Sequence, residues 1–215
     1  MRRVVSKMAG VALVVLAAAG AAHGEEVEAP AVTEIRLDSD YEVVGRSAFG
    51  IRRSLNERRI AAVGMPYDAI TSTTLRWFYA RAPAEAAPSA PSAANACAIR
   101  RPRVELWIEV TLPRWVGASL PPRRGLARLF QRALLRRWAR YLEALTTHEE
   151  GHVEIGRRVA ADLHRDLSSL PIQDCSQLDA RVEALGRAAV DRLRAEHVRY
   201  DADTRHGLAT GAVFP

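Results

Sequence analysis

The sequence predicts an α+β fold in which a small antiparallel sheet packs on one long helix, followed by a C-terminal helix and an ordered tail. Two observations predict this class. Apolar residues recur at every second position in the first half of the chain and at helical spacing after the proline-rich turn at residues 113–122. The chain has 215 residues, 48% of them hydrophobic, which suits one domain with a core of its own.

The first 24 residues have the three parts of a secretory signal peptide. Positive charges open the segment, an apolar run extends over residues 8–22, and small residues follow at Ala22 and Gly24. A membrane anchor is the competing interpretation, but the run has about 15 residues where about 20 are needed to span a bilayer. We therefore expect residues 25–215 to form a single periplasmic or secreted domain with no stable membrane anchor.

Three extended segments and a helix are expected in the first half of the mature chain. The first strand spans residues 33–44, where β-forming residues fall on odd positions, and a helix follows at 48–60. Segments 69–80 and 99–112 are rich in β-branched and aromatic residues and read as a β-hairpin. The loop between them, residues 81–96, is of low complexity and rich in Ala, Pro and Ser.

Two helices are expected in the second half. An apolar stripe with a period of 3.6 continues up to Pro171, so that one long helix would span about residues 125–169. A last helix is expected at 176–198. The tail, residues 200–215, contains glycines and ends in apolar residues, and we expect it to be an ordered loop.

The two cysteines, Cys97 and Cys175, are expected to pair, because an exported chain meets an oxidising compartment. The disulfide would close a loop of about 79 residues and stabilise the fold by about 4 kcal/mol through the entropy of the unfolded chain. The alternative of two free or metal-binding thiols has no CxxC spacing to support it.

The charge pattern does not indicate a polyanionic partner. The mature chain has a net charge of about +3, because three of the cations behind the value of +6 belong to the signal peptide. The arginine pairs at 101 and 103, 123 and 124, and 136 and 137 lack the interleaved aromatic residues of a nucleic-acid surface. We interpret them as solvated faces and expect no nucleic-acid partner.

The long helix carries the sequence His148-Glu149-Glu150-Gly151-His152, which has the form H-E-x-x-H. Residues four apart lie on one helix face, so both imidazoles can reach one Zn²⁺ at about 2.0–2.1 Å. Glu149 then leans toward the open coordination position, where it can act as a general base toward a zinc-activated water. The motif therefore predicts a Zn²⁺ cofactor with His148 and His152 as ligands and Glu149 as the catalytic residue.

The apolar stripe also places His148, Glu149 and His152 on the inward face of the helix. An unpartnered polar group there would cost about 1–3 kcal/mol, and a bound metal would remove that cost. The alternative is that His148 and His152 are core histidines whose hydrogen-bond partners are other groups of the protein.

Zinc needs a third protein ligand, and the metzincin continuation is absent because Ile155 and Arg158 replace its Gly and His. His206 is favoured as this ligand, since a Gly-flanked tail can bring it to the metal from outside the helix. Asp201 is the second choice, or an outer partner if His206 binds the metal. The remaining candidates are His197, Asp203, Glu183 and Glu196.

Three further polar residues have weaker roles. Tyr200 and Arg205 are candidates to polarise a substrate carbonyl or to hold an oxyanion, although packing would explain them equally well. His164 lies beyond the motif, and we interpret it as structural or exposed.

Several segments outside the motif form a distinctive set: residues 41–45, the Thr-rich strand ending in Trp77, L-P-R-W at 112–115, W-x-x-Y-x-x-x-L before the motif, both cysteines, and Y-D-x-x-T-x-H-G-x-x-x-G-A-x-F-P at the C-terminus. With these segments the chain resembles a bacterial family of exported proteins, domain of unknown function 922, described as secreted zinc-dependent proteases. The resemblance implies a zincin-like α+β fold with the zinc motif on its active-site helix. The Ala/Pro/Ser-rich loop near residue 90 departs from it.

The sequence as a whole predicts an exported zinc metallopeptidase that hydrolyses peptide or amide bonds of a protein or peptide substrate. The alternative is a non-catalytic envelope protein with a structural zinc site, because structural and catalytic sites differ by one ligand. The substitution Glu149→Gln separates the two, since it should abolish hydrolysis while the fold and the zinc remain.

Overall fold

The computed structural model describes residues 31–57, 60–62, 65–83, 95–119 and 124–214. The predicted signal peptide, and residues 84–94 of the low-complexity loop, lie outside the described residues. Of that predicted loop, residues 81–83 belong to a strand and Ala96 begins the next one.

The main sheet consists of β1 (Val32–Val43), β5 (Ala96–Trp115) and β4 (Ile70–Pro83), in that order, and the short β6 (Gln173–Asp174) pairs with the start of β5. β4 and β5 run antiparallel, which confirms the predicted hairpin and shows that both strands are longer than expected. Along β5, every second residue from Val104 to Val110 is buried, as the alternation predicted.

The prediction of a wholly antiparallel sheet was wrong, because β1 pairs with β5 in parallel. Alternation along a strand identifies its buried face and carries no information about the direction of its neighbour. A parallel pair needs a long connection, and here α1, two short strands and β4 lie between β1 and β5. The sheet is therefore mixed.

The connection from β1 to β4 holds a short helix, α1 (Ala48–Glu57), and a small two-stranded sheet of β2 (Ile60–Ala62) and β3 (Met65–Tyr67). The helix predicted at 48–60 is thus present and ends before its predicted last residues. The two short strands were not predicted, because three-residue segments are too short to show a period.

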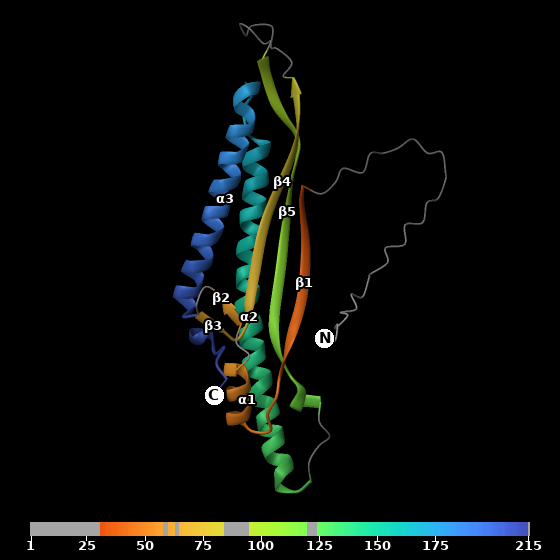
Figure 1. Ribbon diagram of the computed structural model, residues 1–215, viewed down its shortest axis with the longest axis vertical. Helices are drawn as coiled ribbons and strands as arrows, with labels where there is room; N and C mark the ends of the chain where they lie inside the picture. The colour runs from red at the N-terminus through yellow and green to blue at the C-terminus, as the bar shows by residue number, and fades with distance from the viewer. Residues whose placement is uncertain (1–30, 58–59, 63–64, 84–94, 120–123, 215) are drawn as a thin grey trace, which may run out of the picture.

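The long helix α2 (Leu126–Ser168) agrees with the predicted span to within one residue at either end. At 1.5 Å per residue its 43 residues extend over about 65 Å. Figure 1 shows α2 lying lengthwise along the sheet, with α3 (Cys175–Thr204) beside it. The first part of α2 continues past the sheet and α1.

The last helix, α3, begins where the sequence predicted and continues six residues beyond Val198, through residues that were expected to form a loop. The first residues of the predicted ordered tail, including Asp201, are therefore helical. The stretch from 199 to 204 contains neither Gly nor Pro, so nothing in it stops a helix. The helix ends at Arg205, which adopts the left-handed conformation and forms the C-cap.

Two apolar clusters hold the helices on the sheet. One joins β5 to the second half of α2 and to α3, and includes Leu106, Val159 and Leu178. The other surrounds Trp138 and Phe214 near the chain end. Along α2 the H-E-x-x-H segment falls between Leu145 of the second cluster and Val153 of the first, so packing fixes the helix on both sides of it.

A disulfide joins Cys97 to Cys175, as predicted, and ties the start of β5 to the first residue of α3. Such a bond is stable in an oxidising compartment. Within the described ranges, no helix combines the length and the apolar character that crossing a membrane requires.

Candidate metal centre

The three polar residues of the motif lie inside the protein. Relative exposures are 5% for His148, 4% for Glu149 and 7% for His152, and among the described residues the only other buried polar side chain is that of Ser54. Three polar groups so close together in a core need hydrogen-bond, ion-pair or metal partners, because burying them unpaired is costly. The predicted inward orientation of the motif is therefore confirmed.

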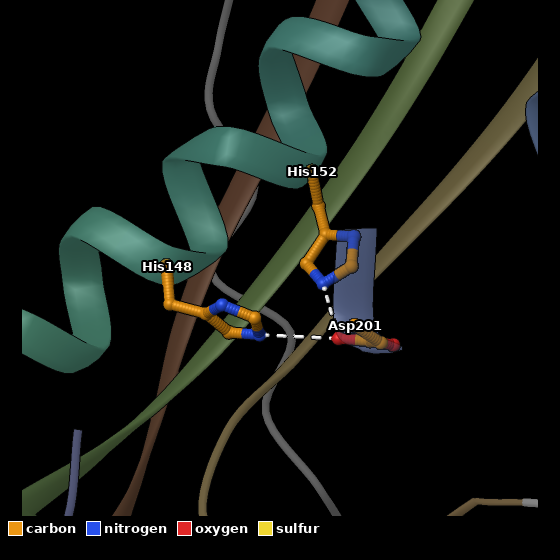
Figure 2. A group of neighbouring side chains, drawn as sticks. All are labelled: His148, His152 and Asp201. Atoms are coloured by element: carbon orange, nitrogen blue, oxygen red, sulfur yellow. Dashed lines mark hydrogen bonds and ion pairs between the residues drawn. The ribbon is translucent and has the colours of Figure 1, made fainter. Parts of the chain in front are cut away.

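The two histidines converge on one carboxylate oxygen. The Nε2 atoms of His148 and His152 lie 3.2 and 3.1 Å from Oδ1 of Asp201, as Figure 2 shows. The three candidate ligand atoms lie within 4.8 Å of one another. In a tetrahedral zinc site with bonds of about 2.0–2.1 Å, neighbouring ligand atoms are about 3.3 Å apart. These side chains therefore have the donor types and spacings of a candidate metal site.

The carboxylate of Asp201 is stabilised in its charged form. Burial alone would raise its pKa, but hydrogen bonds from His148 and His152 outweigh that effect and hold the pKa of Asp201 well below its ordinary value. An ionised carboxylate with two imidazoles is a ligand set that suits Zn²⁺.

Close packing of α3 on α2 brings Asp201 to the motif. A Cβ atom at Gly151 would lie 2.1 Å from Oη of Tyr200, so the glycine is what allows this tyrosine to lie against the helix. The ring of Tyr200 stacks on His148 at a centroid distance of 5.1 Å and meets His152 edge-on. Tyr200 therefore packs against both imidazoles, and a role of its hydroxyl in polarising a substrate carbonyl stays a prediction.

The second ring nitrogen of each histidine also has a partner. Nδ1 of His152 lies 2.8 Å from Nδ1 of His197, and Nε2 of His197 lies 2.9 Å from Oγ1 of Thr73 on β4. Nδ1 of His148 lies 3.4 Å from Oγ1 of Thr204. These contacts leave both Nε2 atoms as the nitrogens that point toward Asp201. Outer partners of this kind orient the histidine ligands of metal sites.

The ring of His197 is neutral at neutral pH, because burial and the neighbouring His152 lower its pKa to about 4. If Nε2 of His152 bound a cation, its Nδ1–H would donate to Nδ1 of His197, and the Nε2–H of His197 would donate to Thr73. One chain of hydrogen bonds thus runs from the candidate site to the sheet.

His206, the ligand favoured by the sequence, lies beside the group. Its Nδ1 atom is 3.6 Å from Oδ1 of Asp201, its side chain is 43% exposed, and its ring lies 5.4 Å from that of Tyr67. Arg205 and His206 both have a positive φ, near 50°, and Gly207 follows at 78°. This left-handed turn directs the chain back across the end of α3. Ligation by His206 stays a prediction, and the group that meets the ligand spacing contains Asp201 instead.

The remaining ligand candidates are engaged elsewhere. Glu196 pairs with Arg158, and Glu183 with Arg187. Asp203 is exposed. His164, which the sequence analysis interpreted as structural or exposed, contacts the carbonyl oxygen of Pro102. The structure brings none of these side chains into the group around His148.

Glu149 lies next to the candidate metal group and is not part of it. Its Oε2 accepts a hydrogen bond of 2.7 Å from the hydroxyl of Thr71 on β4. Burial raises the pKa of Glu149, while the hydrogen bond from Thr71 and the two imidazoles act against this shift. The neighbouring Glu150 points away and forms a bidentate pair with Arg36. Of the two adjacent carboxylates, only Glu149 is available to the site.

A cavity of about 740 Å³ opens over the group. Glu149, His148, His152 and Asp201 line it, and so does every residue of β4 from Ile70 to Leu75. Successive side chains of a strand point to opposite faces, so a cavity that touches all of them borders the edge of the strand. β4 is an end strand in the order β1-β5-β4 of the described sheet.

Comparison with known protein families assigns the chain to one family. The family DUF922, described as a bacterial protein of unknown function, matches residues 38–207. The chain belongs to the DUF922 family. The matched part contains the motif, Asp201 and His206. No curated protein and no solved structure matches the chain.

His197 and Asp201 of this DUF922 centre were both among the ligand candidates, but their relation to one another was missed. They are four residues apart, a spacing that places both on one face of a helix. That signal depends on α3 continuing to Thr204, and an early end of the helix hides it. Thr71 and Thr73 lie two apart on β4 and share a face, but no local pattern shows that this face meets the motif.

Proposed function

We propose that this DUF922 protein is an exported zinc-dependent metallopeptidase that hydrolyses peptide or amide bonds. One observation carries the proposal: His148, His152 and Asp201 form a candidate ligand group in a cavity that also contains a separate buried carboxylate, Glu149. The motif on its helix, beside a sheet, is also the arrangement that a zincin-like fold would have.

The residues present fit Zn²⁺. Two imidazole nitrogens and one carboxylate oxygen are typical zinc donors, and three protein ligands leave a coordination position open, as in catalytic sites. When bound, Zn²⁺ lowers the pKa of a coordinated water and polarises a substrate carbonyl. The cavity over the group provides the space that a water and a substrate need.

Glu149 is the general base in this proposal. It takes a proton from the attacking water and returns it to the nitrogen of the leaving amine. Thr71 holds one carboxylate oxygen, which fixes the orientation of the side chain. Burial makes the carboxylate a stronger base than one in water, because it raises the pKa of Glu149.

The form of the cavity supports an extended peptide as the substrate. The edge of β4 from Ile70 to Leu75 borders the cavity, and Thr71 of this edge donates a hydrogen bond to Glu149. An extended chain can pair with such an edge through its backbone, a recognition mode that tolerates many side chains. We therefore propose an unfolded or flexible protein segment as the substrate class.

The alternative of a structural zinc site depends on His206. A closed site needs four protein ligands, and His206 is the nearby imidazole that could supply the fourth, with Nδ1 at 3.6 Å from Asp201. Its 43% exposure and its ring contact with Tyr67 instead support a role at the rim of the cavity.

The test compares Glu149→Gln with Glu150→Gln, which makes the same change one residue away on a side chain that pairs with Arg36. Both variants are loaded with one equivalent of zinc and assayed on a pool of quenched fluorescent peptides, with the products identified by mass spectrometry. Glu149→Gln should retain zinc and lose activity by at least about 100-fold, whereas Glu150→Gln should stay within a few-fold of the parent protein.

Equal activity of the Glu149→Gln variant and the parent protein would refute the assigned base. An inactive parent protein whose zinc has four protein ligands by X-ray absorption spectroscopy would favour the structural role.

A further inference from the structure

The first part of α2 is strongly basic. From Leu126 to Leu142 the helix has five arginines and no acidic residue, although residues 25–215 as a whole have a net charge of only about +3. Within the described part of the chain, no carboxylate forms an ion pair with Arg136, Arg137 or Arg140. Arg136 and Arg137 are exposed, in agreement with their interpretation as a solvated face, and together with Arg140 they concentrate positive charge on one stretch of α2.

Large apolar side chains occur at the same end of the helix. Leu126, Leu129 and Phe130 are 75%, 59% and 74% exposed, and Figure 1 shows that this end of α2 extends beyond the sheet and α1. They form a stripe with a spacing of three to four residues, which continues along the same face to Arg137 and Arg140. The solvent-facing stripe of α2 is thus apolar at its tip and cationic behind it.

A second cavity, of about 920 Å³, adjoins this stripe and is separate from the one over the metal centre. Its lining combines four arginines with aromatic rings: Arg46, Trp115, Phe130, Arg136, Arg137 and Arg140. A ligand of this groove would have to provide both negative charge and apolar surface.

We propose that the exposed end of α2, residues 126–140, together with the adjoining groove, is a docking site for an anionic phospholipid surface. Phosphate groups would meet the arginines, and acyl chains would receive Leu126, Leu129 and Phe130. Phe130 and Arg137 are seven residues apart on one face, about 10 Å along the helix, so the apolar and the cationic side chains can meet one surface together.

The choice of a lipid surface follows from the combination of the two features. A nucleic acid would satisfy the arginines and leave Leu126 and Leu129 in water, because it recognises proteins through phosphates and through stacking on aromatic rings. The attachment would be peripheral and reversible, because only Leu126, Leu129 and Phe130 would enter the acyl region. This membrane-docking proposal is independent of the proposed peptidase activity.

The test is co-sedimentation of the purified protein with vesicles that contain 30% phosphatidylglycerol in phosphatidylcholine, against vesicles of phosphatidylcholine alone. The variant Arg136→Glu/Arg137→Glu/Arg140→Glu should bind anionic vesicles at least about 100-fold more weakly. The matched control is Arg181→Glu/Arg187→Glu/Arg199→Glu, which changes the net charge equally at exposed positions of α3 and should bind like the parent protein. Zinc content and circular dichroism confirm that each variant is folded.

A third variant, Leu126→Ser/Leu129→Ser/Phe130→Ser, keeps the charge and should lose the part of the binding that persists at high salt. The proposal is overturned if the parent protein does not bind anionic vesicles, if it binds neutral vesicles equally well, or if both triple arginine variants bind alike. Binding to DNA or to polyglutamate without binding to anionic vesicles would assign the surface to a different polyanion. This result would also overturn the proposal.

Discussion

Nδ1 of His152 lies 2.8 Å from Nδ1 of His197, so a residue of α3 sets the orientation of a candidate metal ligand on α2. We predict that His197→Ala weakens zinc binding by about 10- to 100-fold, the usual effect of losing an outer partner of a histidine ligand. Zinc affinity is measured by competition with a chromophoric chelator.

Two variants serve as controls for this prediction. His197→Gln replaces the imidazole by an amide, whose oxygen can accept from His152 and whose NH₂ group can donate to Thr73. This variant should therefore bind zinc more tightly than His197→Ala. His164→Ala removes an imidazole that contacts Pro102, far along α2 from the motif, and should leave the affinity unchanged. If His197→Ala binds zinc like the parent protein, the contact between the two rings does not orient His152 for metal binding.

The third ligand is tested by comparing Asp201→Ala with His206→Ala. We predict that Asp201→Ala reduces zinc affinity by more than the about 100-fold expected for an outer residue, because Oδ1 of Asp201 meets both Nε2 atoms. His206→Ala should reduce it by less than about tenfold. The d–d spectrum of the Co²⁺-substituted protein reports the ligand set, and the reverse order of effects would assign the ligand to His206.

Gly207 is predicted to position His148. An alanine Cβ at this residue would lie 2.8 Å from Cβ of Ala212 and 3.2 Å from Cγ of His148, at a φ of 78°. Gly207→Ala should therefore lower both the free energy of unfolding and the zinc affinity. Gly211→Ala is the matched control, since Gly211 is also left-handed, at a φ of 90°, but its Cβ would lie no closer than 3.9 Å to any neighbour.

The two variants share the backbone cost of about 1–2 kcal/mol for a non-glycine residue in this conformation. Chemical denaturation gives this cost, and chelator competition gives the affinity. Equal losses of both quantities in Gly207→Ala and Gly211→Ala would show that the contact with His148 has no effect.

Removal of the disulfide is predicted to reduce stability without changing the metal centre. Cys97→Ala/Cys175→Ala should lower the free energy of unfolding by about 4 kcal/mol, because the bond closes a loop with a sequence separation of 78. Asp201 is 26 residues from Cys175 along α3, about 39 Å of helix. Denaturant titration should therefore show the loss, and zinc affinity of the folded variant should stay within a few-fold of the parent value.

Periodicity in the sequence predicted the elements whose burial depends on local pattern. The span of α2, the hairpin of β4 and β5 and the inward orientation of His148 all follow from spacings of two or of 3.6 residues. The disulfide followed from the number of cysteines and the expected compartment.

Features that depend on contacts between distant segments were not predictable in this way. The parallel direction of β1 is determined by its neighbour β5, and no residue within β1 encodes it. The C-terminal end of α3 was placed too early because its last residues are polar and because a non-glycine residue, Arg205, adopts the left-handed cap. Both Asp201 and His206 were expected in the tail, where His206 was favoured because a Gly-flanked loop can bring it to the metal. The longer helix instead gives Asp201 a defined position beside the motif.

The candidate ligands come from two helices, and His152 and Asp201 are 49 positions apart in the sequence. A chain in which α3 has not yet docked therefore has both imidazoles of the motif but lacks the carboxylate. The Cys97–Cys175 bond fixes the opposite end of α3, so the disulfide and the candidate metal group lie at the two ends of the same helix. If the group binds a metal as proposed, the complete ligand set would exist only after α3 has docked on α2, so metal loading would follow formation of the tertiary structure.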